Sequence, residues 1–176
     1  MAASSASDGL LDARARPVKV PSDAPVTVEL TSLLDEVRVL IEGAYRESEV
    51  KIEWRAQENL PLVRADRYGL IQVFLNLAKN SQRAMESTKT RKLRVSTSLE
   101  DKHVTVRVED TGIGIAHPEN LFRPFQPGAV TAGLGYVSRS IMRSFGGELL
   151  YEPRAEGCCF AVVVPAIAVV EEAMNA

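Results

Sequence analysis

Residues 104–114 read Val-Thr-Val-Arg-Val-Glu-Asp-Thr-Gly-Ile-Gly, a strand-like alternation of apolar and polar residues that runs directly into two closely spaced glycines. Asp110 stands where this strand ends, and its carboxylate can only accept hydrogen bonds. Gly112 and Gly114 allow the backbone to approach a flat ligand. A carboxylate in this place suits the exocyclic amine of adenine and opposes the carbonyl oxygen of guanine. The alternative is an ordinary glycine turn with a capping aspartate.

The chain before this strand supplies a partner strand and a long helix. Residues 93–99 alternate as a second strand, and the pair Asp101-Lys102 predicts a tight turn between the two strands. Helical spacing predicts a long helix from about Asp66 to Met85. The apolar stripe predicted to face the core consists of Leu70, Ile71, Phe74, Ala78 and Met85.

Asn76, Asn80 and Arg83 lie on the opposite face of this helix, because residues three and four positions apart project from one side. Asparagine costs a helix roughly 0.5 kcal/mol or more relative to alanine. Two asparagines in mid-helix, in register with a cation, therefore favour a functional role over the alternative of a merely solvated face. An amide oxygen is a hard neutral ligand for Mg²⁺, and an arginine suits phosphate.

A further helix is predicted to open at Gly133-Leu134-Gly135, to run from about residue 134 to residue 145, and to stop at Gly146-Gly147. Free backbone N–H groups at a helix start form an anion site, although a single Gly-x-Gly is weak evidence on its own. The apolar stripe of this helix consists of Val137, Ile141 and Phe145.

The remaining strands and the first helix are predicted from shorter sequence patterns. Alternation predicts strands at residues 26–30, 50–54, 149–151 and 160–164. Ser32 is predicted to cap a helix between the first two of these strands. The apolar stripe of that helix is Leu33, Val37, Leu40, Ile41 and Ala44. The order of elements predicts an α+β fold, a two-layer α/β sandwich with a mixed sheet and its helices on one face.

The composition fits one globular domain. The chain has 176 residues, of which 45% are hydrophobic and 25% charged, and its formal net charge is -2. No basic field attracts nucleic acid or an anionic membrane, and no apolar run is long enough for a membrane span. Cys158 and Cys159 are adjacent and cannot staple distant segments, so a cytoplasmic location is expected. Residues 1–25 are expected to be a linker or the end of a preceding dimerisation helix, residues 26–165 the domain, and residues 166–176 a tail.

In their order and spacing, four motifs resemble the nucleotide-binding boxes of the catalytic domain of bacterial sensor histidine kinases. The motifs, which correspond to the N, G1, F and G2 boxes, are Asn76-Leu77-Ala78-Lys79-Asn80, Asp110-Thr111-Gly112-Ile113-Gly114, Leu121-Phe122-Arg123-Pro124-Phe125 and Gly133-Leu134-Gly135. The closing Gly157-Cys158-Cys159-Phe160 is similar to the family's last glycine segment. The resemblance covers residues 26–165 and implies the Bergerat ATP-binding fold, with a mostly antiparallel sheet, which gyrase, heat-shock chaperone and mismatch-repair ATPases share.

The resemblance also implies roles for single residues. Asn80 is expected to coordinate Mg²⁺, and Asn76 to contact the phosphates or the metal shell. Asp110 is expected to bind adenine, with Gly112 and Gly114 beside it.

The remaining implied roles concern the phosphates and the lid over them. Residues 126–132 are expected to form a mobile ATP lid anchored by Phe122 and Phe125. This lid lacks lysine and arginine, so phosphate neutralisation is expected to fall on Arg83 and Mg²⁺. The phosphates themselves are expected to meet Gly133, Leu134 and Gly135.

The implied function is to bind Mg-ATP and donate its γ-phosphate to a histidine on a dimerisation hairpin that this chain lacks, in a system with a response regulator. His103 and His117 are expected to be surface residues, so the chain alone is expected neither to phosphorylate itself nor to hydrolyse ATP. Hydrolysis is disfavoured because Asn76 stands where the related ATPases have a glutamate base, and an amide cannot take a proton from water.

Two alternatives stay open. One is a stand-alone serine kinase that resembles anti-sigma factors. The other is a degenerate nucleotide-binding module, because Tyr136 follows Gly135 and leaves the G2 region one residue short at the phosphate edge. Cys158-Cys159 also stands where threonine is common, which removes a hydroxyl that could support the adenine site.

Overall fold

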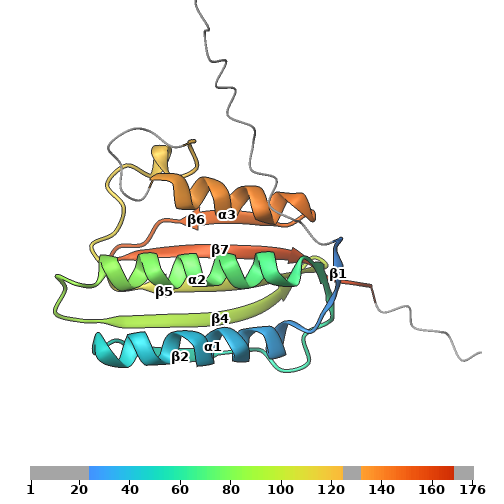
Figure 1. Cartoon of the computed structure of the whole chain (residues 1–176), viewed down its shortest axis with the longest axis horizontal. Helices are drawn as coiled ribbons and strands as arrows, with labels where there is room; N and C mark the ends of the chain where they lie inside the picture. The colour runs from blue at the N-terminus through green and yellow to red at the C-terminus, as the bar shows by residue number, and fades with distance from the viewer. Residues whose placement is uncertain (1–23, 125–131, 169–176) are drawn as a thin grey trace, which may run out of the picture.

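Three helices lie over one face of a five-stranded sheet in the computed structural model, which describes residues 24–124 and 132–168 (Figure 1). The helices are α1 (Leu30–Glu47), α2 (Arg67–Ala84) and α3 (Ala132–Ser144), and a single 3-10 turn, η1, spans Pro118–Asn120. The strands are β1 (Val26–Val28), β2 (Lys51–Arg55), β3 (Val63–Ala65), β4 (Lys92–Glu100), β5 (His103–Asp110), β6 (Glu148–Glu152) and β7 (Cys158–Pro165).

The main sheet is mixed and mostly antiparallel. Its strand order is β2-β4-β5-β7-β6, and only the β2–β4 pair is parallel. Asp101 and Lys102 join β4 to β5 with positive φ angles of 43° and 67°, as a tight hairpin turn requires. The predicted α+β sandwich with its helices on one face is therefore confirmed.

A second, two-stranded sheet pairs β1 with β3 in antiparallel register. The sequence did not predict β3, because three residues are too short for a recognisable alternation. Its side chains at Val63 and Ala65 are fully buried, so the strand belongs to the core all the same. The first predicted strand is also shorter than expected, since Leu30 already begins α1.

The central helix, α2, packs between α1 and α3, and its ends agree with the prediction. The Asp66 carboxylate accepts hydrogen bonds from the N–H groups of Tyr68 and Gly69, both at 3.1 Å, and this stabilises the first turn. Four members of the predicted stripe, Leu70, Phe74, Ala78 and Met85, are buried. Ile71 is only half-buried, which corrects that part of the prediction.

The start and the buried face of α1 differ from the prediction. Glu29, and not Ser32, is the N-cap, and its carboxylate accepts a hydrogen bond from the Ser32 N–H at 3.0 Å. Leu40 and Ala44 are exposed, because they lie one step round the helix from the face that meets the sheet. The buried stripe is Leu30, Leu33, Leu34, Val37, Ile41 and Tyr45.

The buried face of α3 is also rotated from the predicted one. Ser138, Met142 and the following Phe145 are buried, whereas Ile141 is half-buried and Val137 is exposed. The spacing of three and four residues from Ser138 to Phe145 follows the helical repeat more closely than a strict spacing of four. Of the described helices, not one combines the length and the apolar character that crossing a bilayer demands.

Candidate functional site

The end of β5 carries a buried carboxylate. Asp110 is only 1% exposed, and both of its oxygens accept a hydrogen bond. The N–H of Gly112 donates to Oδ1 at 2.9 Å, and the thiol of Cys158 donates to Oδ2 at 3.1 Å. Since a carboxylate offers about four acceptor sites, these two bonds leave acceptor capacity for a further donor.

The two glycines after Asp110 differ in what they contact. Gly112 is buried against Ala84 at the end of α2, where an added Cβ atom would collide with the Ala84 side chain and carbonyl. The next residue, Ile113, donates its N–H to the Ala84 carbonyl at 3.0 Å. Only Gly114 lines the neighbouring cavity, so Gly112 serves the close approach of the loop to α2 and is not itself at the cavity wall.

A cavity of about 540 Å³ opens between α2, α3 and the strand ends of β5 and β7. This volume suits a small-molecule ligand. Five residues predicted as binding residues line it: Asn80, Arg83, Asp110, Gly114 and Gly135. Its wall is otherwise mostly apolar, with Leu77, Ile115, Leu121, Leu149 and Phe160. The structure thus brings together motifs that lie as much as 55 residues apart in the chain.

The remaining predicted residues have other positions. Asn76 and Phe122 are half-buried beside the cavity and do not line it. Gly133 and Leu134 lie in the first turn of α3, where the backbone alone is described. Phe125 and residues 126–131 of the predicted lid lie outside the described residues, and Ala132 already begins α3.

Of the two asparagines of α2, Asn76 contacts α3 and Asn80 lines the cavity. The Asn76 side-chain amide donates a hydrogen bond to Ser138 Oγ at 3.2 Å. Asn80 Oδ1 is buried and has no partner in the described part of the chain. Buried polar atoms in native proteins nearly always have a partner, so an orphaned amide oxygen at a cavity wall points to a missing ligand atom.

Ser138 of α3 is a site residue that the sequence reasoning missed, and its neighbour Arg139 lies beside the site without lining the cavity. Ser138 is buried, lines the cavity and holds Asn76. The guanidinium of Arg139 lies 4.6 Å from the centre of the Phe122 ring and bonds Glu148 at 2.7 Å. One signal for Ser138 was available in the sequence, because Ser138 precedes Met142 by four positions and Phe145 by seven, which is the spacing of one helix face.

The Arg139 contacts hold Glu148 in its charged form. Burial raises the pKa of the Glu148 carboxyl, but the hydrogen bonds from Arg139 and Arg143 outweigh burial and keep that pKa below its ordinary value. Glu148 begins β6, so this ion pair joins α3 to the sheet beside the cavity. Phe122 is thereby held against α3 through Arg139, and its role as an anchor of the lid stays a prediction.

Tyr45 of α1 holds the part of α2 that lines the cavity. Its hydroxyl donates to the carbonyl of Ala78 at 2.7 Å, within the segment that carries the two asparagines. Burial raises the pKa of Tyr45, and the negative charge of Asp110 raises it further, so the phenol stays protonated and keeps donating. The second asparagine is therefore presented from a helix segment that is tied to α1.

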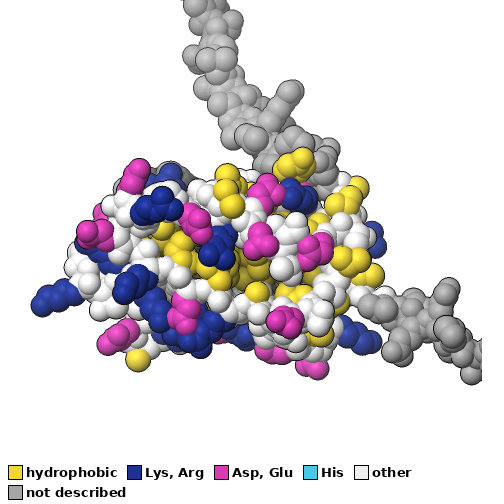
Figure 2. Space-filling model, turned by 90° about the horizontal axis from the view of Figure 1, so that it is seen from below, with side chains coloured by type: hydrophobic (Ala, Val, Ile, Leu, Met, Phe, Trp, Pro, Cys, Tyr) yellow, Lys and Arg dark blue, Asp and Glu magenta, His cyan; other side chains and the backbone are white. Residues whose placement is uncertain are grey.

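A second, smaller hollow of about 150 Å³ lies between α1 and β2, far from these motifs in the fold. Its wall includes Leu34, Arg38 and Trp54, and the Arg38 guanidinium lies 5.8 Å from the Trp54 ring centre. Seen from this side, apolar side chains show between charged ones (Figure 2). No motif of the sequence maps to it, so the larger cavity is the candidate site.

Comparison with known proteins places this geometry in context. Residues 65–168 match the family model described as histidine kinase-, DNA gyrase B-, and HSP90-like ATPase. The sensor protein FixL of Bradyrhizobium diazoefficiens is 34% identical over 143 residues, which are 78% of this chain and 28% of FixL. The C4-dicarboxylate transport sensor protein DctS of Rhodobacter capsulatus is 33% identical over 156 residues, 84% of this chain and 24% of DctS. The chain thus spans about a quarter of these relatives.

Solved structures agree with the sequence comparison. The nucleotide-free catalytic domain of the histidine kinase ThkA superposes with a TM-score of 0.70 at 28% identity, covering 82% of this chain and 97% of that domain. A complex of ThkA with the response regulator protein TrrA contains a similar domain, with a TM-score of 0.68 at 27% identity over 81% of this chain and 42% of the kinase.

Proposed function

Because the chain belongs to the family of histidine kinase-, DNA gyrase B- and HSP90-like ATPases, we propose that its cavity binds Mg-ATP and presents the γ-phosphate to a histidine on another domain. The chain is an ATP-binding catalytic domain of the sensor histidine kinase type. The single observation that carries the proposal is the convergence of Asn80, Asp110, Gly114 and Gly135 on one cavity. What we propose beyond this is which residues bind the nucleotide, that the metal is Mg²⁺, and that the acceptor is a histidine.

We assign adenine to the Asp110 end of the cavity. The carboxylate there is buried among apolar residues, which suit the faces of a purine, and it retains acceptor capacity for the exocyclic amine. Guanine would place a carbonyl oxygen against the same carboxylate, and two opposed acceptors are unfavourable in a buried site. Adenine nucleotides are therefore expected to bind more tightly than guanine nucleotides.

We assign Mg²⁺ and the phosphates to the Asn80 end. The described residues contain no cluster of three or more His, Cys, Asp or Glu side chains that could hold a metal ion unaided. The orphaned Asn80 Oδ1 fits Mg²⁺, which commonly takes one or two protein oxygens and completes its shell with phosphates and water. Bound there, Mg²⁺ would neutralise phosphate charge. Arg83 at the rim and the first-turn N–H groups of α3 would bind phosphate oxygens directly.

Phosphoryl transfer depends mainly on positioning and charge neutralisation, which these residues can supply. Asn76 is an amide already donating to Ser138, and it cannot accept a proton from water as a base would. The site therefore favours transfer to a held acceptor over hydrolysis. The proposed partners are a dimerisation hairpin that carries the acceptor histidine, as the family resemblance implies, and a response regulator, by analogy with the complex of ThkA and TrrA.

Calorimetric titration tests the proposal. ADP and a non-hydrolysable ATP analogue are each titrated into the chain with Mg²⁺ and with EDTA, and GDP serves as the matched control. Saturable binding of both adenine nucleotides, strengthened by Mg²⁺ and much weaker for GDP, is expected. Equal affinities for ADP and GDP, or no binding of either, would refute the nucleotide assignment.

Incubation with γ-labelled ATP tests the direction of transfer. The chain alone is expected to remain unlabelled and to release little phosphate, whereas a cognate dimerisation hairpin added in trans is expected to become labelled on its histidine. Stoichiometric label on His103 or His117, or steady phosphate release that Asn76→Ala abolishes, would contradict the assignment.

A further inference from the structure

Cys158 is the cross-strand partner of Asp110. The two residues face each other in the β5–β7 register, and both are buried. Side chains of directly opposed residues project to the same face of a sheet, and here the thiol reaches Asp110 Oδ2 at 3.1 Å. Cys158 also lines the cavity, so it contacts both the carboxylate and the space proposed for adenine.

The backbone before Cys158 fixes this contact. Gly157 has a φ of +67°, and an added Cβ atom would collide with the carbonyl of Asp110. The start of β7 is therefore held directly against the end of β5, which leaves the thiol little freedom to move away from the carboxylate. The neighbouring Cys159 is equally buried but points to the opposite face of the sheet, where its sulfur lies 3.7 Å from Glu152 Oε2.

The thiol also keeps its proton. Burial raises the pKa of Cys158, and the negative charge of Asp110 raises it further, so the sulfur is neutral at physiological pH and can donate. One donor, the Gly112 N–H, binds Oδ1, and a second, the thiol, binds Oδ2. Two donors on different oxygens oppose rotation of the carboxylate about its terminal torsion, which is otherwise broad.

We propose that Cys158 is a positioning residue for purine specificity: its thiol holds the Asp110 carboxylate in the orientation that accepts the exocyclic amine of adenine. This inference rests on the adenine site proposed above. The Cys158 thiol supplies a donor where the family resemblance implies a threonine hydroxyl. Removing the thiol would leave the cavity open to a purine but would free the carboxylate to rotate away from the amine.

The test compares ADP with purine riboside 5′-diphosphate, which lacks only the exocyclic amine. Both ligands are titrated into the native chain and into Cys158→Ala, Cys158→Ser and Cys159→Ala. Cys158→Ala is expected to reduce the preference for ADP over the analogue by about fivefold, the size of one net hydrogen bond, and to leave affinity for the analogue unchanged. Cys158→Ser restores a donor and is expected to retain most of the preference. Cys159→Ala, the matched control on the opposite face, is expected to match the native chain.

An infrared readout separates positioning from a merely structural role. The S–H stretching band of Cys158 is expected to shift on ADP binding in the native chain and in Cys159→Ala, and this shift is expected to be absent in Cys158→Ala. Circular dichroism and thermal unfolding check that each variant folds. If Cys158→Ala fails to fold, the ligand preference of Cys158→Ser and the infrared shift in the native chain still test the role of Cys158.

The possible failures can be told apart. Equal weakening of ADP and the analogue in Cys158→Ala, or an unchanged preference, would overturn the role of Cys158 while leaving the adenine site standing. Failure of the native chain to bind ADP at all would instead overturn the proposed function.

Discussion

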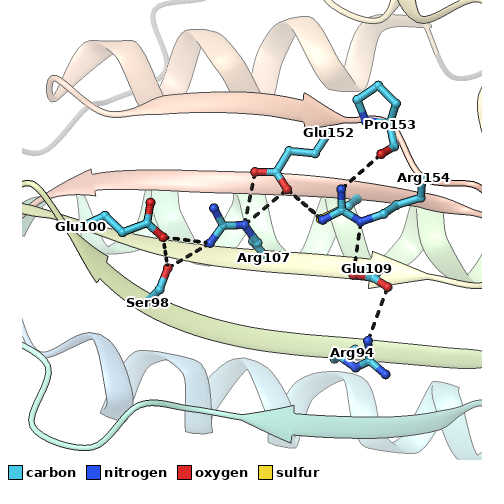
Figure 3. A network of polar contacts seen from close by, with 9 residues as sticks. Arg94, Ser98, Glu100, Arg107, Glu109, Glu152, Pro153 and Arg154 are labelled. Carbon is cyan, nitrogen blue, oxygen red and sulfur yellow. Dashed lines mark hydrogen bonds and ion pairs between the residues drawn. The ribbon is translucent and has the colours of Figure 1, made fainter.

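The charged side chains on the two faces of β5 differ in whether they form ion pairs. On the face away from the helices, Arg107 bonds Glu152 at 3.2 Å and Ser98 at 2.9 Å, and Arg154 bonds Glu152 at 2.9 Å (Figure 3). Glu109 adds contacts with arginines on both sides, so each charge in this network has an opposite charge beside it. On the helix side, Asp110 is far more buried, yet no ion pair to it exists among the described residues.

This contrast separates structural charges from a binding charge. The outer network is half-exposed and satisfied, and such pairs contribute little to stability and leave nothing for a ligand to bind. On the inner side, within residues 24–124 and 132–168, the buried carboxylate is held only by an N–H and a thiol, and it shares a cavity wall with the unpartnered amide oxygen of Asn80 on α2. Unsatisfied buried groups cost free energy in the absence of a ligand, so the inner face is where binding can recover it.

The largest expected effect comes from Asp110→Asn. The substitution keeps the shape but replaces one carboxylate oxygen by an amide donor, which would oppose one of the two donors now bound to Asp110 and reduce the capacity to accept the adenine amine. ADP affinity is expected to fall by about 1.5–3 kcal/mol in calorimetry. Glu109→Gln, the adjacent residue on the outer face, is the matched control and is expected to bind ADP like the native chain. A comparable loss of ADP affinity in both variants would show that Asp110 is no more important for binding than a charge on the outer face.

A smaller and more selective effect is expected for Asn80→Ala, which deletes the proposed oxygen ligand of Mg²⁺. Nucleotide affinity is measured with Mg²⁺ and with EDTA, and the variant is expected to lose most of the difference between the two conditions. Lys79→Ala, exposed and next to it on α2, should retain that difference. If chelation costs Asn80→Ala and the native chain the same affinity, Asn80 is not a metal ligand.

A third, weaker effect is expected for Ser138→Ala. The variant leaves the Asn76 amide without its acceptor, so ATP-analogue affinity should fall by about 0.5–1.5 kcal/mol, the net value of one hydrogen bond. Ser140→Ala changes an exposed serine of the same helix and is expected to have no effect. Equal behaviour of the two serine variants in calorimetry would show that the Asn76–Ser138 bond does not support binding.

The same contrast explains what the sequence could and could not predict. Asp110 and the long helix were predictable, because a strand end, a capping aspartate and helical spacing are local signals. The partners of these residues were not, because Cys158 and Ser138 come into contact only through the β5–β7 register and the packing of α3 on α2. The α3 stripe was misassigned for a related reason, since a small polar residue, Ser138, occupies a core position beside the cavity.

The smallest effect is expected on the outer face, where it should appear in stability and not in binding. Burial raises the pKa of Glu152, but the bonds from Arg154 and Arg107 outweigh burial and hold that pKa below its ordinary value. A carboxyl with a lowered folded-state pKa stabilises the fold above its unfolded-state pKa and loses that contribution as the pH falls through the folded-state value.

Glu152→Gln should therefore reduce the free energy of unfolding by at most about 1 kcal/mol at pH 7, because half-exposed pairs are screened by solvent. In urea unfolding, the gap between the variant and the native chain should narrow as the pH falls below the ordinary glutamate pKa of about 4.3 and then through the lower pKa of the folded-state Glu152 carboxyl. ADP affinity at pH 7 should be the same in both proteins. A gap that widens on acidification would show that Glu152 is stabilised in its protonated form, and a loss of ADP affinity would show that the two faces of the sheet are coupled through β7.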